Sequence, residues 1–272
     1  MTVAKVPHGE SSRFRPQRVA RRSTRALVAL LGALCALAVA PVGASEYTVS
    51  PMRMQLDREA RSTVVTLTNS GTDRIDFQLR AMAWTQDAEG KDRYDETAEL
   101  VYFPKILSLE PSESRIIRVG IRSVPAAAEQ TFRLFIEKIP APNPAPRPPG
   151  AQVAINVRFA LPIFVTPPVH QARGEIPSAS VSRGELVFVL RNSGNEHFRM
   201  DEGIVLIGRD AHGNEVYTRT VEDRYLLGGT TKRYVTVIPK DACVQLATLE
   251  LTAKTEQFVL SRRLDVNRTS CE

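Results

Sequence analysis

The chain has 272 residues, of which 36 are basic and 30 acidic, giving a formal net charge of +6. Residues 1–44 hold seven of the basic residues and one of the acidic ones, so the rest of the chain carries 29 of each sign and is near neutral. This composition gives no support for a nucleic-acid-binding protein, and the length is enough for two domains of ordinary size.

The N-terminal segment has the three parts of a signal peptide. Seven basic residues precede an apolar run of 15 residues, Ala26–Ala40, and a small-residue cleavage signature, Val42-Gly43-Ala44, follows. The run is shorter than the roughly 20 residues that a membrane-spanning helix needs. We expect cleavage after Ala44 and export, with an uncleaved membrane anchor as the alternative.

Residues 45–166 consist of short alternating segments separated by turn residues. Seven such segments in about 120 residues are typical of an immunoglobulin-like β-sandwich. The expected strands are 46–57, 62–68, 76–86, 99–103, 115–122, 131–139 and 153–165.

Every second residue from 153 to 163 is apolar, which predicts a strand with one apolar face. These residues are Val153, Ile155, Val157, Phe159, Leu161 and Ile163. The segment is longer than a usual strand, and an apolar strand of this kind is an aggregation hazard unless something covers it. Two interpretations follow: these are ordinary core residues, or the strand is lent to another chain.

Thr166-Pro167-Pro168 predicts a domain boundary, because adjacent prolines end a strand and stiffen a linker. Residues 167–272 repeat the all-β pattern. Their expected strands are 186–192, 204–208, 216–220, 233–238, 247–254 and 258–266. Asn69 and Asn192, each followed by Ser-Gly, are predicted turn residues in equivalent places of the two domains.

Cys243 and Cys271 form an even pair in a chain that we expect to be exported, which favours a disulfide. Closing a loop of this length is worth roughly 3 kcal/mol in the chain-entropy model. Two free thiols or a pair of zinc ligands are the alternatives, but no nearby His or Cys completes a metal set.

The sequence gives no case for enzyme chemistry. No G-x-S-x-G, H-E-x-x-H or glycine-rich phosphate loop follows a suitable strand. The acidic segment 87–96 lacks the ligand spacing of a calcium loop and fits a solvated hairpin tip. His170, His197 and His212 are scattered, and Trp84 is expected in or near a core. We expect no catalytic residue, no metal, no cofactor and no nucleotide.

Several short motifs, in their order and spacing, resemble one known family. Glu110-Pro111, Arg118-Val119 and the run FRLFIEKIP at 132–140 precede the long alternating strand. With the signal peptide and the two sandwiches, they resemble the periplasmic chaperones of pilus assembly over essentially the whole mature chain. Arg133 and the segment RFALPIF at 158–164 look more like the archaic branch, which assembles spore-coat-U-like subunits.

The resemblance implies an all-β chain with two immunoglobulin-like β-sandwich domains in an L-shaped, boomerang-like molecule. It implies a periplasmic, ATP-independent chaperone that binds, folds and caps pilus subunits by donor-strand complementation, a form of strand addition. An outer-membrane usher then receives the subunit. The donor strand carried over is 151–164, and its subunit-binding residues are Val153, Ile155, Val157 and Phe159.

The family also binds the subunit's C-terminal carboxylate with basic residues between the domains. Arg53 lies near one of the family's positions, whereas Pro162 occupies the other, so the usual pair is incomplete. In the archaic branch an Arg on the sixth strand takes this role, which here is Arg133, and Arg158 is a third candidate. A guanidinium suits the role because it binds a carboxylate through two parallel hydrogen bonds. The alternatives for Arg133 are a charge on the surface face of its strand or an ion pair with Glu137.

Two other functions stay open. An exported two-domain adhesion or scaffolding module would use the sandwiches as spacers, and it requires residues 153–164 to be protected at both edges. A periplasmic hydrolase would need a polar cleft with a perturbed acid or base. A homodimer that caps its own apolar strand is also consistent with the pattern.

Overall fold

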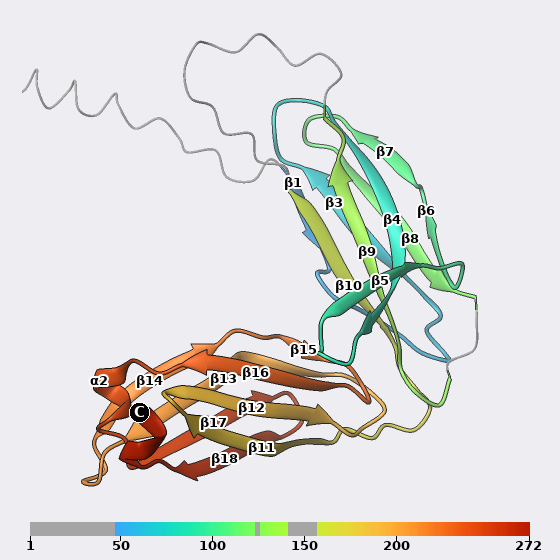
Figure 1. Ribbon diagram of the computed structural model, residues 1–272. Coiled ribbons are helices and arrows are strands. Elements are labelled where there is room, and N and C mark those ends of the chain that lie inside the picture. The colour runs from blue at the N-terminus through green and yellow to red at the C-terminus, as the bar shows by residue number, and fades with distance from the viewer. Residues whose placement is uncertain (1–46, 123–125, 141–156) are drawn as a thin grey trace, which may run out of the picture. The chain divides into compact units, whose positions relative to one another are not determined.

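The computed structural model describes residues 47–122, 126–140 and 157–272, all of which lie in one unit, Ser45–Glu272. These residues form two β-sandwiches, one after the other along the chain (Figure 1). The all-β class and the two immunoglobulin-like sandwiches are confirmed. The predicted signal peptide lies outside the described residues.

The first sandwich consists of a four-stranded and a six-stranded sheet. The order in the smaller sheet is β1 (Tyr47–Ser50), β3 (Ser62–Asn69), β8 (Ser114–Ile121) and β6 (Leu100–Phe103). The order in the larger sheet is β2 (Met54–Leu56), β10 (Arg158–Val165), β9 (Gln130–Lys138), β4 (Ile75–Gln86) and β5 (Asp92–Glu96), with β7 (Ile106–Leu109) also paired to β4. The pairing of β2 with β10 is parallel, and the other pairings in this sandwich are antiparallel.

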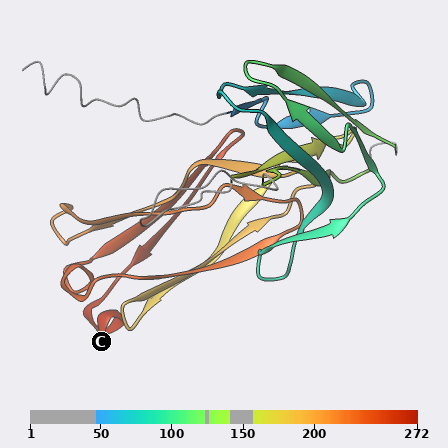
Figure 2. The ribbon, with the colours of Figure 1, turned by 90° about the horizontal axis from the view of Figure 1, so that it is seen from above.

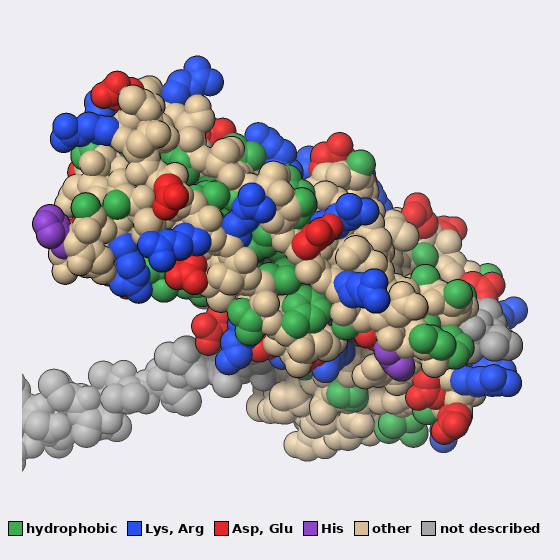
Figure 3. Space-filling view, turned by 90° about the horizontal axis from the view of Figure 1, so that it is seen from below, with side chains coloured by type: hydrophobic (Ala, Val, Ile, Leu, Met, Phe, Trp, Pro, Cys, Tyr) green, Lys and Arg blue, Asp and Glu red, His purple; other side chains and the backbone are tan. Residues whose placement is uncertain are grey.

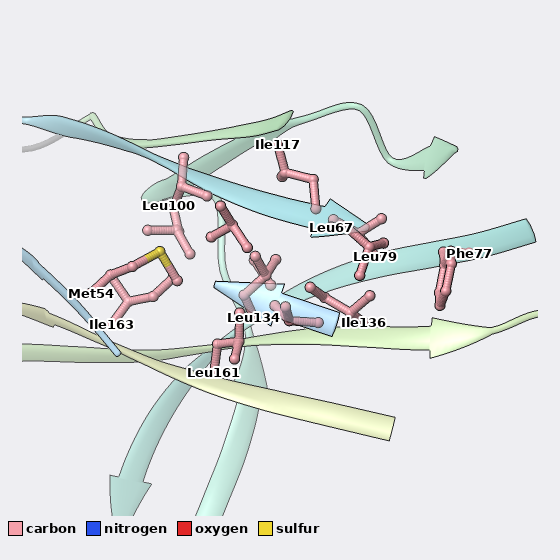
Figure 4. Close-up of a cluster of buried hydrophobic side chains, with 14 of the residues drawn as sticks. Met54, Leu67, Phe77, Leu79, Leu100, Ile117, Leu134, Ile136, Leu161 and Ile163 are labelled. Carbon is pink, nitrogen blue, oxygen red and sulfur yellow. The ribbon is translucent and has the colours of Figure 1, made fainter. Parts of the chain in front are cut away.

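The inward-facing side chains of the two sheets form the core of the first sandwich (Figure 4). Leu67 and Ile117 from the smaller sheet and Leu134 from the larger one are fully buried. Leu161 and Ile163 of β10 belong to the same cluster and are also fully buried. Burying each such side chain stabilises the fold by about 1.5–3 kcal/mol. The C-terminal half of β10 is therefore held firmly in the sandwich.

The segment 46–57, predicted as one strand, is instead two strands in different sheets. β1 pairs with β3 in the smaller sheet, and β2 pairs with β10 in the larger one. The chain changes sheet at Pro51, which has no N–H to continue a ladder. β5 and β7 were not predicted either; β5 is exposed throughout and so has no apolar alternation to reveal it.

The second sandwich consists of a three-stranded and a five-stranded sheet (Figure 2). The smaller sheet has the order β11 (Gly174–Ser182), β12 (Glu185–Asn192) and β16 (Thr231–Val237). The larger sheet has the order β14 (Glu215–Val221), β13 (Phe198–Arg209), β17 (Thr248–Thr255) and β18 (Val259–Asp265), with β15 (Tyr225–Leu226) paired to β13. β11 and β15 were not among the predicted strands.

A disulfide closes the C-terminal end of this sandwich. Cys243, at the end of the short helix α2 (Lys240–Cys243), is bonded to Cys271 in the 3-10 helix η1 (Arg268–Cys271). Both residues are buried and belong to the second core cluster. The predicted disulfide is confirmed.

The two sandwiches repeat one buried polar network. Asn69 is fully buried, and its Nδ2 donates to the carbonyl of Asp73 at 2.7 Å and to that of Leu109 at 3.2 Å. Asn192 is equally buried, and its Nδ2 donates to the carbonyls of Glu196 at 2.8 Å and Leu226 at 2.9 Å. Each side-chain oxygen accepts the N–H of the glycine two residues on. These asparagines therefore supply hydrogen-bond partners for buried backbone groups in turns and at strand ends.

Charged side chains of both signs are interspersed over the face shown in Figure 3. This distribution agrees with the near-neutral charge of residues 45–272. Among the described residues, no helix is long and apolar enough to cross a membrane.

Replacing Asn69 or Asn192 by Ala should lower the free energy of unfolding by about 3 kcal/mol, because buried carbonyl and N–H groups lose their partners. Urea unfolding of the single variants measures this. The exposed Asn214, changed to Ala, is the control and should shift stability by less than about 0.5 kcal/mol. If Asn69→Ala lowered the free energy of unfolding no more than the control does, the network would not stabilise the fold.

Candidate functional site

Strand β10 is paired along its whole length on one edge but over only three residues on the other. β9 lies beside Arg158–Val165, whereas β2 lies beside Ile163–Val165. No described strand pairs with the second edge of residues 158–162. The backbone groups of such an edge are available to a strand from another chain.

The predicted donor residues are divided by the limits of the described chain. Val153 and Ile155 lie outside the described residues. Val157 is 42% exposed, and its carbonyl accepts a hydrogen bond from the Tyr47 hydroxyl at 3.2 Å. Phe159 is half-buried against the core, with its ring centroid 5.5 Å from that of Tyr47 in an edge-on arrangement. Exposure of the apolar row thus decreases along β10 toward the buried Leu161.

Four side chains from the two sandwiches form a buried cluster that is separate from the core of either sandwich. Trp84 and Phe164 come from the first sandwich, and Tyr225 and Leu227 come from the second. The Trp84 ring centroid lies 5.9 Å from that of Phe164 and 5.7 Å from that of Tyr225. Trp84 is buried as expected, but it lies outside either sandwich core. We call the place where these four side chains meet the junction of the two sandwiches.

Two polar contacts hold the junction beside these rings. The Gln86 side chain donates to the Tyr225 carbonyl at 3.0 Å and accepts the Leu227 N–H at 2.9 Å. Glu129 accepts the backbone N–H of His197 at 2.8 Å, and its carboxylate lies 2.8 Å from His197 Nδ1. The Glu129 side chain is only 2% exposed, and the His197 ring stacks on Phe164 at 3.6 Å. The junction is therefore both apolar and hydrogen-bonded.

A pocket of about 550 Å³ lies against this junction. The first sandwich lines it with Met52, Trp84, Gln86, Gly90, Lys91, Asp92, Arg133, Ala160 and Pro162. The second sandwich lines it with Asp223, Arg224, Tyr225 and Lys232. The Lys232 stem fills the space that a side chain at Gly90 would need, since a Cβ there would lie 2.5 Å from Lys232 Cγ. Of the three candidate arginines, Arg133 is the one that lines this pocket.

Arg133 lies over the Trp84 ring, with Cζ 3.7 Å from the ring centroid. Its Nη1 donates to the Ala160 carbonyl at 3.2 Å, and its Nε is buried without a hydrogen-bond partner. Burial lowers the pKa of the Arg133 guanidinium, while Tyr94 and Asp92 act in the opposite direction. In the described part of the chain, no carboxylate lies within ion-pair distance of it. The cation is therefore partly desolvated and has no described carboxylate in direct ion-pair contact, although the charge of Asp92 acts in its favour.

Arg53 and Arg158 each have a carboxylate partner already. Arg53 Nη1 lies 3.1 Å from Glu256 of the second sandwich, which also pairs with Arg199 at 3.1 Å. Arg158 Nη1 lies 3.2 Å from Glu137, and its Cζ lies 4.7 Å from the Phe135 ring centroid. The partner of Glu137 is thus Arg158, and the alternative pairing of Arg133 with Glu137 was wrong.

Sequence reasoning missed the contribution of the second sandwich to this site. Tyr225, Asp223 and Lys232 have no motif around them, and they reach the site only because the fold brings β15 and β16 to it. His197 is one of the scattered histidines, and its partner Glu129 lies 68 residues away in sequence. No local signal could have found these pairs. Among the described residues, no three His, Cys, Asp or Glu side chains gather as a metal site.

Residues 46–170 match the family model described as "Pili and flagellar-assembly chaperone, PapD N-terminal domain". This match spans the first sandwich and the start of the connection to the second. No curated protein matches the chain.

Solved structures with the same fold include three that are described as chaperones or chaperone complexes. A chain of the CsuC–CsuE chaperone–tip adhesion subunit complex, from the archaic Csu pili of Acinetobacter baumannii, has a TM-score of 0.56 at 17% identity, covering 79% of this chain and 97% of that one. The YadV chaperone has a TM-score of 0.55 at 12% identity, covering 81% and 100%. The complex of the Salmonella enterica SafA pilin with the SafB chaperone has a TM-score of 0.50 at 12% identity, covering 82% and 98%. At these identities the likeness concerns the fold.

Replacing Glu129 by Ala should lower the free energy of unfolding by about 2 kcal/mol, because the buried His197 N–H loses its acceptor. It should also raise the accessibility of Trp84, the single tryptophan, to iodide quenching. Glu185→Ala is the control, since Glu185 is exposed on β12. Equal unfolding and quenching curves for the two variants would contradict a structural role for the Glu129–His197 contact.

Proposed function

We propose that the chain is a non-enzymatic pilus-assembly chaperone and that it binds and caps pilus subunits in the periplasm by donor-strand complementation; the match of residues 46–170 to the chaperone family model supports this. The observation that carries this proposal is the open edge of β10 at residues 158–162, next to the exposed Val157. A subunit strand beside this edge would complete the backbone hydrogen bonds. The apolar side chains of this chain's own donor strand would enter the groove of the subunit.

The energy of capping comes from burial and needs no cofactor or nucleotide. Val153, Ile155 and Val157 each contribute about 1.5–3 kcal/mol if they are transferred from water into an apolar groove. Phe159 continues the row, but it already contacts Tyr47 and the core. We assign it to the rooted end of the donor strand. A subunit is released without chemistry when a better-fitting strand replaces this one.

Among the three arginines, Arg133 is our candidate for binding the subunit's C-terminal carboxylate. It is desolvated and unpaired within the described residues, whereas Arg53 and Arg158 are engaged by Glu256 and Glu137. A carboxylate would supply the missing counter-ion and would find a guanidinium whose position is already set by Trp84. The engaged arginines would first have to give up their present partners.

The Arg133 pattern and the segment 158–164 place the chain, in our proposal, in the archaic branch of these pathways. The remaining steps of the proposal are export to the periplasm, with cleavage of the signal peptide after Ala44, and delivery of the subunit to an outer-membrane usher. Cells that contain the chaperone, its subunit and its usher should then assemble pili, and removal of the chaperone should leave the subunit to degradation.

The double variant Ile155→Asp with Val157→Asp should fold but fail to protect a co-expressed small exported subunit. An ionised carboxylate is too costly to bury in an apolar groove, so the yield of co-purified subunit should fall by about tenfold or more. Val259→Asp is the matched control, because Val259 is a 59% exposed valine on the second sandwich. An unchanged yield of co-purified subunit with the double variant would contradict the proposal.

Hydrogen exchange across residues 151–157, which precede the part of the strand that is paired with β9, separates the proposal from the adhesion or scaffolding alternative. The chaperone requires fast exchange in the free chain and strong protection in the complex with subunit. Equal protection in both states would favour the spacer module.

Arg133→Gln should weaken subunit binding by about tenfold or more, since a charge-assisted hydrogen bond to a carboxylate is lost. Arg53→Gln and Arg158→Gln should have smaller effects. The dissociation constants of the three variants for one purified subunit test this order. A larger loss for Arg53→Gln or Arg158→Gln would move the anchor to that residue.

A further inference from the structure

The pocket beside Arg133 is much larger than a carboxylate group. Its volume of about 550 Å³ lies in the range of sites that enclose a whole small ligand. Both sandwiches contribute walls, and the hairpin between β4 and β5 contacts Lys232 through Gly90. Such a pocket has room for the side chain that accompanies a terminal carboxylate.

The charges around the pocket leave positive groups free and negative groups engaged. Asp223 pairs with Lys232 at 2.8 Å and accepts the Tyr234 hydroxyl. Asp92 accepts hydrogen bonds from Gln86 and Tyr94, each at 3.1 Å. Among the described residues, Arg133, Lys91 and Arg224 have no carboxylate within ion-pair distance, and the last two are exposed. One carboxylate would therefore be attracted to this pocket.

The same pocket has an apolar part. Met52 is 55% exposed, and Ala160 and Pro162 lie in the wall with it. Methionine is flexible and polarisable, so it adapts to apolar side chains of different shape. A second acidic group would meet Asp92 and Asp223 in the same wall, and a basic one would meet four cations, of which only Lys232 is paired.

We propose that this pocket holds the complete terminal residue of the bound partner and selects an apolar side chain there. Arg133 binds the carboxylate, Lys91 and Arg224 strengthen the attraction, and Met52 contacts the side chain. This inference rests on the proposed function, because it requires the partner's chain to end in the cleft.

The test uses the mature chain and acetylated Ser-Thr-Ser-X peptides, where X is Leu, Gly, Asp or Lys as the free acid, or Leu as the carboxamide. Trp84 reports binding through its fluorescence, since it is the single tryptophan and lies under Arg133. The Leu acid should bind most tightly. Gly should bind about fivefold and the carboxamide about tenfold more weakly. Asp and Lys should bind no better than Gly.

Two variants separate the parts of the pocket. Met52→Ser should abolish the preference for Leu over Gly while keeping the preference for the acid over the carboxamide. Arg133→Gln should do the reverse, with Arg133→Lys as a partial rescue that checks folding. Val259→Ser is the control and should change neither preference. Three results would each overturn the proposal. The Leu, Gly and Asp acids could bind equally, no peptide could give a saturable signal, or Met52→Ser could keep the preference for Leu over Gly.

The outcome is distinguishable from failure of the proposed function. Selective peptide binding by a chain that captures no pilus subunit would keep the pocket and reject the chaperone. Subunit capture that depends on Val157, in a chain without peptide selectivity, would keep the chaperone and reject the pocket.

Discussion

The constraint on which the structure depends is the uneven pairing of β10, which among the described strands is paired along its whole length on one edge but only from Ile163 onward on the other. Leu161 and Ile163 fix its C-terminal half in the core, and β2 covers the second edge only from Ile163 onward. The preceding residues keep an open edge, and Val157 beside it is exposed. Open apolar edges promote aggregation, so a chain that keeps one is expected to use it. Strand addition needs no catalytic group, which agrees with the match of residues 46–170 to the pilus-chaperone family model.

The junction of the sandwiches places a guanidinium on a buried aromatic cluster. Trp84, Phe164 and Tyr225 exclude water, while Gln86 and Glu129 satisfy the backbone groups that close approach would otherwise strand. Arg133 lies on this cluster and loses hydration without gaining a carboxylate among the described residues. In our proposal, this guanidinium binds a carboxylate from outside the chain.

The two sandwiches satisfy buried backbone groups in the same way, but they differ in what they expose. Asn69 and Asn192 are buried in matching networks that satisfy the carbonyls of neighbouring turns. The second sandwich adds the Cys243–Cys271 disulfide at its C-terminal end, whereas the first has the half-paired β10. Stability and binding are thus placed in different parts of the chain.

The sequence by itself determined the all-β class, the apolar alternation of β10 and the two cysteines, because period-two patterns and residue counts are local properties. It also named Arg133 through a family resemblance. Only the tertiary structure decided that residues 46–57 form two strands in two sheets, that Glu137 pairs with Arg158, and that Lys232 and Tyr225 line the pocket. These features depend on contacts between residues far apart in sequence, which no local pattern encodes.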